Sequence, residues 1–303
     1  MAETSAAPTT SVAICTFNRS DDVDRCLNAT TEQVRNAGFP VLVIDSGSDA
    51  AHRAKLEHSC RRHGARYVRC DAPGLSVARN TALRAVATPW ISFLDDDAVP
   101  HPDWARNLSA AVKQTDDDVA GIGGKISPKF PDACPHDHIT PSWLLLLSCV
   151  EAAGQGDIDY SNYRVCGANL TLRVKYVLEV GGFPQKLGRH GGSLMSGEEA
   201  FIIERLIETG RRVLYNDTFS VDHYIPAART MIDWAARRAF WEGASRVEIH
   251  RQLSRPIPAT MNIAKLAASY PILRALSLVR GGVDERLRAS RALGSLYWQV
   301  KIW

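Results

Sequence analysis

Three consecutive carboxylates, Asp95, Asp96 and Asp97, are the group of residues in this sequence best suited to chemistry. Clustered carboxylates repel one another and lose hydration, and a divalent cation compensates for both effects. Their oxygen ligands suit magnesium or manganese. A solvated acidic turn is the alternative, because aspartate is common in turns. Metal binding is favoured because the triplet directly follows the apolar run Trp90–Leu94.

Other polar residues follow apolar runs in the same way. Thr16, Asn18 and Arg19 end or follow the run Ser11–Thr16, and Asp45 ends the run Val41–Asp45. Each of these residues alone would most simply be a turn or helix-cap residue. Their recurrence at the ends of several runs predicts that they gather at one edge of a sheet.

Alternating strands and helices must position these residues. Short apolar, β-branched runs predict strands over 11–16, 41–45, 65–69 and 90–94. The segments between them predict three helices: one over about 20–37, one that follows the turn at 46–49 and ends at Arg62, and one over 77–87. This order predicts an α/β fold, with a mostly parallel sheet flanked by helices on both faces. Ligands bind at the carboxyl ends of strands in such sheets, which is where the polar residues lie.

Composition sets the class of protein. The 303 residues are 45% hydrophobic and 23% charged, which is typical of a soluble globular protein and excludes a disordered, collagen-like or coiled-coil chain. Charge is uneven, because residues 224–303 hold 13 lysines and arginines against 5 acidic residues. This basic region predicts either peripheral contact with an anionic membrane face or helices packed on the rest of the chain, with a solvated basic surface.

Several features indicate the compartment. The 7 cysteines are odd in number and lack CxxC spacing, which suits a reducing environment. The polar N-terminus does not resemble a signal peptide, and no apolar stretch approaches the roughly 20 residues that span a bilayer. We therefore expect a cytoplasmic protein, with any membrane contact peripheral and at the inner face, and no nucleic-acid partner.

The sequence resembles the family 2 glycosyltransferases, which have the GT-A nucleotide-sugar-binding fold, a Rossmann-like sheet. The matching segments occur in the family's order: SVAICTFNR (11–19), VIDSGSD (43–49), GLSVARNTAL (74–83), ISFLDDDAVPHPDW (91–104), GAN (167–169), GEEAFIIERLIETG (197–210) and VDH (221–223). The resemblance implies a disordered terminus over 1–10, a catalytic domain over 11–245 and a helical extension over 246–303. The catalytic domain would have a nucleotide-sugar half, 11–125, and an acceptor half, 126–245.

The resemblance also implies roles for individual residues in the donor half. The nucleotide-sugar site would comprise Thr16, Asn18, Arg19, Asp45, Arg79, Asp95 and Asp96. Within this set, Thr16, Asn18 and Asp45 would hold the base, and Asp95 would contact the ribose. The metal, Mn²⁺ or Mg²⁺, would be held on the diphosphate by Asp97 and by His223, which follows a predicted last core strand, 219–221.

In the acceptor half, the resemblance assigns Gly167, Ala168 and Asn169 to the acceptor side. Trp143, in the poorly patterned loop 127–164, would either pack against a sugar or lie in the core. Arg237 and Arg238 stand where some relatives have a QxxRW motif, which this sequence does not match. They would either neutralise the diphosphate or lie on a solvated helix face.

The general base is expected among Glu198 and Glu199, where family members usually have Glu-Asp. Helical steps from Glu199 reach Ile202, Ile203, Leu206 and Ile207, which predicts that Glu199 heads the inward face and that Glu198 points toward Phe201 and Arg205. A helix N-terminus favours an ionised carboxylate. We therefore favour Glu199 as the base; alternatively, both glutamates only complement the helix dipole.

Together these features predict a metal-dependent, inverting glycosyltransferase. It would move a sugar from a nucleotide sugar, with a UDP-sugar favoured, to an acceptor hydroxyl in glycan, lipid-linked glycan or natural-product biosynthesis. Two alternatives remain: a magnesium-dependent phosphotransferase or phosphatase with an aspartyl nucleophile in the triplet, and a non-catalytic nucleotide- or glycan-binding module. The sequence does not indicate an oligomeric state.

Overall fold

The computed structural model describes residues 8–70, 72–158, 164–189, 193–258, 261–279 and 282–301. The N-terminus expected to be disordered lies mostly outside this part of the chain, since residues 1–7 are not described. Thr10 is ordered as the first residue of strand β1.

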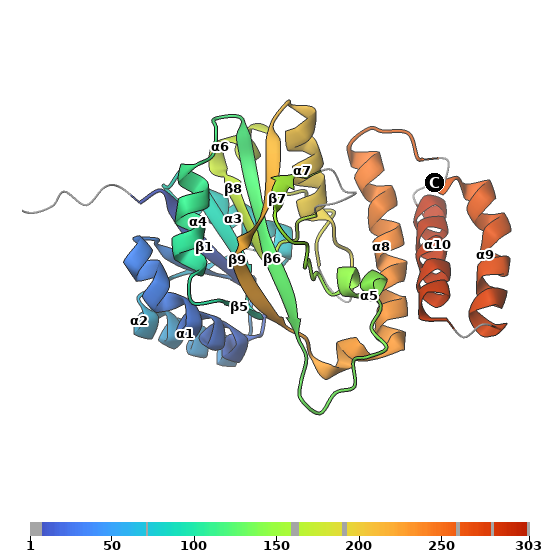
Figure 1. Ribbon diagram of the computed structural model, residues 1–303, viewed down its shortest axis with the longest axis horizontal. Helices are drawn as coiled ribbons and strands as arrows, with labels where there is room; N and C mark the ends of the chain where they lie inside the picture. Colours follow the sequence, from blue (N-terminus) through green and yellow to red (C-terminus); the bar gives the residue numbers. More distant parts are fainter. Residues whose placement is uncertain are drawn as a thin grey trace, which may run out of the picture.

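A nine-stranded sheet forms the centre of the molecule, in the order β3-β2-β1-β4-β8-β6-β9-β5, with β7 paired to β9 (Figure 1). The strands are β1 (Thr10–Thr16), β2 (Val41–Asp45), β3 (Arg66–Arg69), β4 (Trp90–Asp95), β5 (Ala98–Pro100), β6 (Val119–Lys129), β7 (Gln155–Asp157), β8 (Asn169–Arg173) and β9 (Arg212–Tyr224). The first four strands pair in parallel, as do β6 and β9. Strand β8 runs antiparallel to both of its neighbours, so parallel pairing does not extend across the sheet.

Helices cover both faces of the sheet, which confirms the predicted α/β class. Helices α1, α2 and α4 pack together on one face, whereas α3 packs on β1 and β2, and α7 packs on β9 and α6. Their bounds are α1 (Ser20–Ala37), α2 (Ala50–His63), α3 (Leu75–Ala85), α4 (Trp104–Lys113), α6 (Val174–Glu179) and α7 (Glu198–Glu208).

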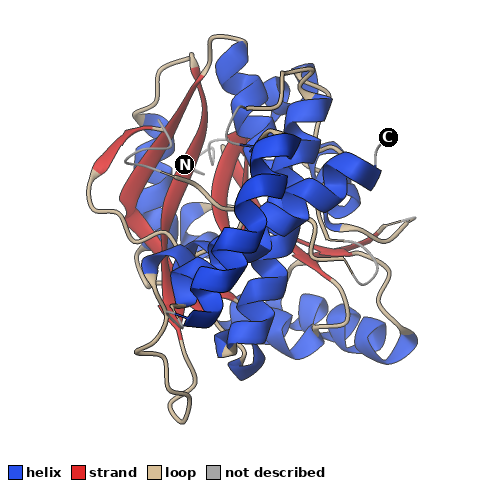
Figure 2. Cartoon of the chain, turned by 90° about the vertical axis from the view of Figure 1, so that its right-hand side faces the viewer, coloured by secondary structure: helices blue, strands red, loops and turns tan. Residues whose placement is uncertain are grey.

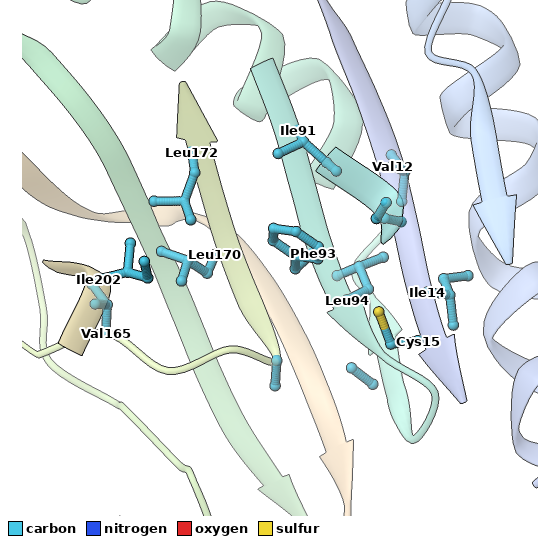
Figure 3. Close-up of a cluster of buried hydrophobic side chains, with 14 of the residues drawn as sticks. Val12, Ile14, Cys15, Ile91, Phe93, Leu94, Val165, Leu170, Leu172 and Ile202 are labelled. Carbon is cyan, nitrogen blue, oxygen red and sulfur yellow. The ribbon is translucent and has the colours of Figure 1, made fainter. Parts of the chain in front are cut away.

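The core lies between the sheet and these helices. Figure 3 shows Val12 and Ile14 of β1, Phe93 of β4, Leu170 of β8 and Ile202 of α7 within one buried cluster. Full burial of one such side chain contributes about 1.5–3 kcal/mol to folding. This packing holds the carboxyl ends of β1 and β4 in fixed positions beside each other.

The segment expected to be an unpatterned loop, 127–164, contains two short elements, α5 (Pro141–Leu146) and β7. The last core strand, β9, covers Arg212–Tyr224 and is therefore longer than the predicted 219–221. It includes His223. A 3₁₀ turn, η1 (Ala227–Thr230), follows it.

Three C-terminal helices, α8 (Ile232–Gln252), α9 (Ile263–Val279) and α10 (Val283–Lys301), lie side by side next to the sheet (Figures 1 and 2). Close approach of α8 and α10 depends on Gly243 and Gly294, since a Cβ at Gly294 would lie 1.7 Å from the carbonyl oxygen of Phe240. The expected domain boundary at 245/246 falls inside α8, which is one continuous helix. None of the helices described combines the length and apolar character needed to cross a bilayer.

Candidate active site

A cleft of about 630 Å³ gathers most of the residues singled out in the sequence. It opens at the carboxyl ends of β1 and β4, and the start of α7 and the loop after β9 contribute further residues to it. The charged residues that line it are Arg19, Asp22, Arg79, Asp95, Asp96, Asp97, Arg189, Glu198, Glu199, His223, Arg229 and Arg238.

The carboxylates and the imidazole expected to hold a metal lie together at one end of this cleft. His223 Nε2 lies 3.0 Å from Asp97 Oδ1, and both side chains are 3% exposed. Asp95, Asp97 and His223 each offer one ligand atom, and these atoms lie within 4.8 Å of one another. The buried Nδ1 of His223 has no hydrogen-bond partner among the described residues, which leaves it available to a ligand. Two carboxylates and one imidazole are a donor set that fits Mn²⁺ or Mg²⁺.

Cations also converge on this cluster of carboxylates. Arg19 Nη1 lies 2.6 Å from Asp96 Oδ1, and its Nη2 lies 2.9 Å from Asp97 Oδ2. Arg229 Nη1 is 3.5 Å from the same Asp97 oxygen. Burial alone would raise the pKa of Asp97, but the hydrogen bond from His223 and the charges of His223, Arg19 and Arg229 hold that pKa far below its usual range. The Asp97 carboxylate is therefore ionised throughout the physiological pH range and can act as a ligand.

Asp96 differs from Asp97 although the two are adjacent. Burial, together with the nearby charge of Asp97, raises the pKa of Asp96 to about 7. Its Oδ2 accepts a hydrogen bond of 2.8 Å from the Thr16 hydroxyl. The Thr16–Asp96 contact joins the ends of β1 and β4 directly, as the parallel pairing of these strands requires.

Asn18 and Asp45 are not among the residues that line the cleft. Asp45 is fully buried, and it accepts hydrogen bonds from Tyr67, Arg69 and the backbone N–H of Ser48. Although burial would raise its pKa, these hydrogen bonds lower it. Asn18 adopts a positive φ of 53° and accepts a hydrogen bond from the Asp49 N–H. In this structure both residues therefore shape the loop after β2.

A buried ion pair joins α3 to α7. Arg79 Nη1 lies 2.7 Å from Glu198 Oε1, and both side chains are 3% exposed. The guanidinium is also 3.7 Å from Glu199 and 3.8 Å from Asp95. Gly167 makes room for it, because a Cβ there would lie 2.0 Å from Arg79 Nη2. Arg79 thus lies between Asp95 and the two glutamates of α7.

Glu199 lines the cleft at the start of the buried face of α7, as predicted, but Glu198 lines the cleft too, which the helical pattern did not predict. Glu198 is the more buried of the two, and Ile207, placed on the inward face by the helical steps, is 40% exposed. The pattern of α7 alone could not predict this, because Arg79 of α3 draws Glu198 inward. Burial and the neighbouring charge of Glu199 raise the pKa of Glu198 to about 7. Glu198 Oε2 and Glu199 Oε2 both lack a hydrogen-bond partner among the described residues. Arg79 donates a hydrogen bond of 2.7 Å to the other oxygen of Glu198 but lies 3.7 Å from Glu199, so Glu199 is the less tightly held carboxylate.

The segment assigned to the acceptor contributes only Gly167 to the cleft lining. Ala168 is buried, and Asn169 accepts from Trp104 Nε1 and donates to the carbonyl oxygens of Lys125 and Phe219. Trp143 is fully buried in a separate cluster, which fits the core alternative and not contact with a sugar. The fully buried side chains of Asn169 and Trp143 cannot touch an acceptor in this conformation.

The two arginines of α8 have different environments. Arg237 is exposed and does not line the cleft, whereas Arg238 is buried and does. Sequence reasoning missed Arg189 and Arg229, which also line the cleft. Neither belongs to a recognisable motif; the only signal available was that a buried cluster of carboxylates requires balancing cations.

Comparisons with known proteins agree with this arrangement. The model of glycosyl transferase family 2 matches residues 11–178, which is more than half of the chain. The chain is 28% identical over 239 residues to the glucosyl-dolichyl phosphate glucuronosyltransferase of Haloferax volcanii, covering 78% of this chain and 75% of that protein. It is 27% identical over 244 residues to the pre-mycofactocin glycosyltransferase of Mycobacterium tuberculosis, covering 76% of this chain and 47% of that protein.

Solved structures share the fold at low sequence identity. The mannosyltransferase PcManGT of Pyrobaculum calidifontis, in complex with GDP-Man and Mn²⁺, superposes with a TM-score of 0.64 at 18% identity, covering 96% of this chain and 88% of that chain. GalNAc-T7 with UDP, GalNAc and Mn²⁺ gives a TM-score of 0.53 at 14% identity, covering 83% and 52%. The chain therefore belongs to glycosyl transferase family 2, and it is a glycosyltransferase with the GT-A fold.

Proposed function

We propose that this enzyme transfers a sugar from a nucleoside-diphosphate sugar, with UDP as the favoured nucleotide, to an acceptor hydroxyl with inversion at the anomeric carbon. The observation that carries the proposal is that one cleft is lined by two groups of acidic residues with Arg79 between them. Asp95, Asp97 and His223 form a set that could hold a metal, here called the metal end. Glu198 and Glu199 form the second group, here called the glutamate end, and Arg79 holds Glu198 more closely than Glu199.

The metal end suits the leaving group. Asp97 and His223, with Asp95, would hold Mn²⁺ or Mg²⁺, in keeping with the Mn²⁺ present in two structural neighbours. When bound, such an ion stabilises the negative charge that grows on a departing diphosphate. Arg229, 3.5 Å from Asp97, adds a fixed positive charge beside the same position. The family resemblance of the residues after β1 favours UDP as the nucleotide, although one structural neighbour was solved with GDP-Man.

At the other end, Glu199 would act as the general base. Its carboxylate takes the proton of the acceptor hydroxyl as that oxygen forms a bond to the anomeric carbon. The bond from that carbon to the diphosphate oxygen breaks at the same time, and the nucleoside diphosphate leaves with the electron pair. Attack from the face opposite the leaving group inverts the configuration. Glu198 would serve instead as the partner that fixes Arg79.

The aspartyl phosphotransferase and the non-catalytic module have no comparable support. The family match and the relatives named as glycosyltransferases both indicate glycosyl transfer. Either alternative would also leave the glutamate end of the cleft without a role.

We also propose that the acceptor is a glycan, a lipid-linked glycan or a small natural product. Peripheral contact with an anionic inner membrane face would suit a lipid-linked acceptor. Ile263 and Ile272 of α9 and Val300 of α10 are exposed, within the part of the chain that is rich in lysine and arginine. Co-sedimentation with anionic vesicles but not with neutral ones would support this contact, and equal recovery with both would contradict it.

Turnover by glutamate variants tests the proposal. Wild type, Glu199→Gln and Glu198→Gln are incubated with Mn²⁺ and a panel of UDP- and GDP-sugars, and release of the nucleoside diphosphate is measured with and without pooled acceptor glycans. A positioned base contributes about 10²–10⁴-fold in rate, so Glu199→Gln should lose that factor and still bind nucleotide. Retention of transfer by Glu199→Gln, together with its loss in Glu198→Gln, would assign the base to Glu198. Absence of turnover with every donor would contradict the proposed reaction.

A further inference from the structure

Arg238 of α8 is a buried cation whose hydrogen-bonding capacity is mostly unused. Its side chain is 7% exposed, and Nη2 donates to Ser196 Oγ over 2.9 Å. Nε and Nη1 are buried and have no hydrogen-bond partner among the residues that the structure describes. No carboxylate in that part of the chain lies within 4.0 Å of this guanidinium. An unpaired buried charge with unsatisfied donors is strongly unfavourable, which points to a partner supplied by a ligand.

The position of Arg238 separates it from the metal end. Its hydrogen-bond partner, Ser196, lies just before α7, whose first residues are Glu198 and Glu199. Arg229, in contrast, lies 3.5 Å from Asp97. Both arginines line the same cleft, but of the two only Arg229 lies within 4.0 Å of a carboxylate of the described residues.

Glu242, Glu199 and Glu198 are the acidic residues whose charges act on Arg238, and none of them forms an ion pair with it within 4.0 Å among the described residues. Glu198 is paired with Arg79 at 2.7 Å, and Glu242, also on α8, is paired with Arg246 and Arg291. Arg189 lines the cleft too, and after burial its charge is the largest influence that lowers the pKa of Arg238. Arg189 and Arg238 are thus like charges that line one cleft, a combination that an anion between them would stabilise.

We propose that Arg238, with Arg189, binds an anionic substituent, a carboxylate or a phosphate ester, on the substrate sugar at the glutamate end of the cleft. This inference rests on the proposed function and adds to it a substrate class, a negatively charged sugar. The group is distinct from the donor's diphosphate, which belongs at the metal end. The planar guanidinium offers Nε–H and Nη1–H to the anion while Nη2 remains on Ser196. The charge can be carried either by the transferred sugar or by the acceptor.

Calorimetric titration of the full chain distinguishes these two sources. In the first arm, UDP-glucuronic acid and UDP-glucose are titrated with Mn²⁺ into wild type, Arg238→Gln and Arg237→Gln. The Arg237 variant is the control, since that residue is exposed on the same helix and does not line the cleft. In the second arm, glucuronic acid, glucose 6-phosphate and glucose are titrated into the same three proteins, with and without saturating UDP.

Charge-assisted hydrogen bonds contribute enough to make the anionic ligand bind about 10- to 100-fold more tightly than the neutral one. We expect wild type and Arg237→Gln to show this preference and Arg238→Gln to lose it. Preference in the first arm assigns the anion to the transferred sugar, and preference in the second arm assigns it to the acceptor. Arg189→Gln, at a less buried position, provides a second variant should Arg238→Gln not fold, and it should weaken the preference.

Two results would overturn the inference: equal binding of charged and neutral probes by wild type in both arms, or an unchanged preference in Arg238→Gln. Failure of the proposed donor site would give a different result. UDP would then not bind at all, whereas the second arm without UDP would still compare charged with neutral sugars.

Discussion

Replacement of Gly167 by alanine should destabilise the protein through a single contact. A Cβ at this position would lie 2.0 Å from Arg79 Nη2 and 2.9 Å from Cζ. The φ of Gly167 is not in the left-handed region, so alanine fits the backbone and the steric effect stands alone. Arg79 cannot retreat freely, because it is paired with Glu198 at 2.7 Å and its Cζ lies 5.4 Å from the centroid of the Phe183 ring.

The expected cost follows from these contacts. Overpacking a well-packed site costs about 1–3 kcal/mol, and separation of a buried ion pair costs about 3–5 kcal/mol. Because Arg79 can shift partly and keep some of the pairing, we expect Gly167→Ala to lower the free energy of unfolding by about 3 kcal/mol. The same substitution should cost less than about 1 kcal/mol in an Arg79→Met/Glu198→Gln background, where a shorter neutral side chain leaves room for the methyl group.

Urea unfolding of the four proteins, followed by circular dichroism and tryptophan fluorescence, measures this double-mutant cycle. The slope of the free energy against urea should stay constant across the four, so that the midpoints report stability alone. An equal cost of Gly167→Ala in both backgrounds would refute the argument that Gly167 is required for the placement of Arg79. So would a cost near zero in the wild-type background.

Two further predictions concern regions outside the cleft lining. Gly294→Ala should lower the free energy of unfolding by about 1–3 kcal/mol, because the new Cβ would meet the backbone carbonyl of Phe240. Leu293→Ala, at an exposed position of the same helix, is the control and should cost less. Equal decreases in the urea midpoints of the two variants would contradict this prediction. Asp45 has a lowered pKa when folded, so its contribution to stability is fully present above its usual pKa of 3.8 and is lost as the pH falls through the lower folded value. The stability difference between wild type and Asp45→Asn should therefore shrink below about pH 4, and a difference that stays constant from pH 6 to pH 3 would show that the carboxylate charge does not matter.

The first half of the fold could be predicted because each buried strand there is a short apolar run that ends in polar residues. Strand β6 could not be predicted in this way, since it contains Gly121, Gly123 and Gly124, which have no strand preference of their own. These glycines are required by partners remote in the sequence: a Cβ at Gly124 would lie 2.1 Å from Asn169 Nδ2. The antiparallel direction of β8 could not be predicted either, because the local residue pattern of a strand does not indicate its direction.

Part of the candidate site could be predicted from the sequence, and part could not. The grouping of Asp95, Asp97 and His223 could be predicted because the two aspartates are adjacent to a predicted strand and His223 lies in a recognisable segment. The orientation of Glu198 depends on Arg79, which is over a hundred residues away in the sequence. The helical pattern of α7 does not indicate that partner. Arg189 and Arg229 contribute charge only through their position in space, so no sequence pattern could identify them.

Binding of UDP in the presence and absence of Mn²⁺ tests most directly the claim that the cleft is a metal-dependent donor site. Wild type, Asp97→Asn and Asp222→Asn are titrated with UDP, and GDP and dTDP are run in parallel. Asp222 is the control carboxylate, because it lies on β9 next to His223 and pairs with His101 outside the cleft. We predict Mn²⁺-dependent binding of UDP by wild type and Asp222→Asn, and its loss in Asp97→Asn. Binding of no nucleotide under any condition, or binding indifferent to both Mn²⁺ and Asp97, would contradict the account.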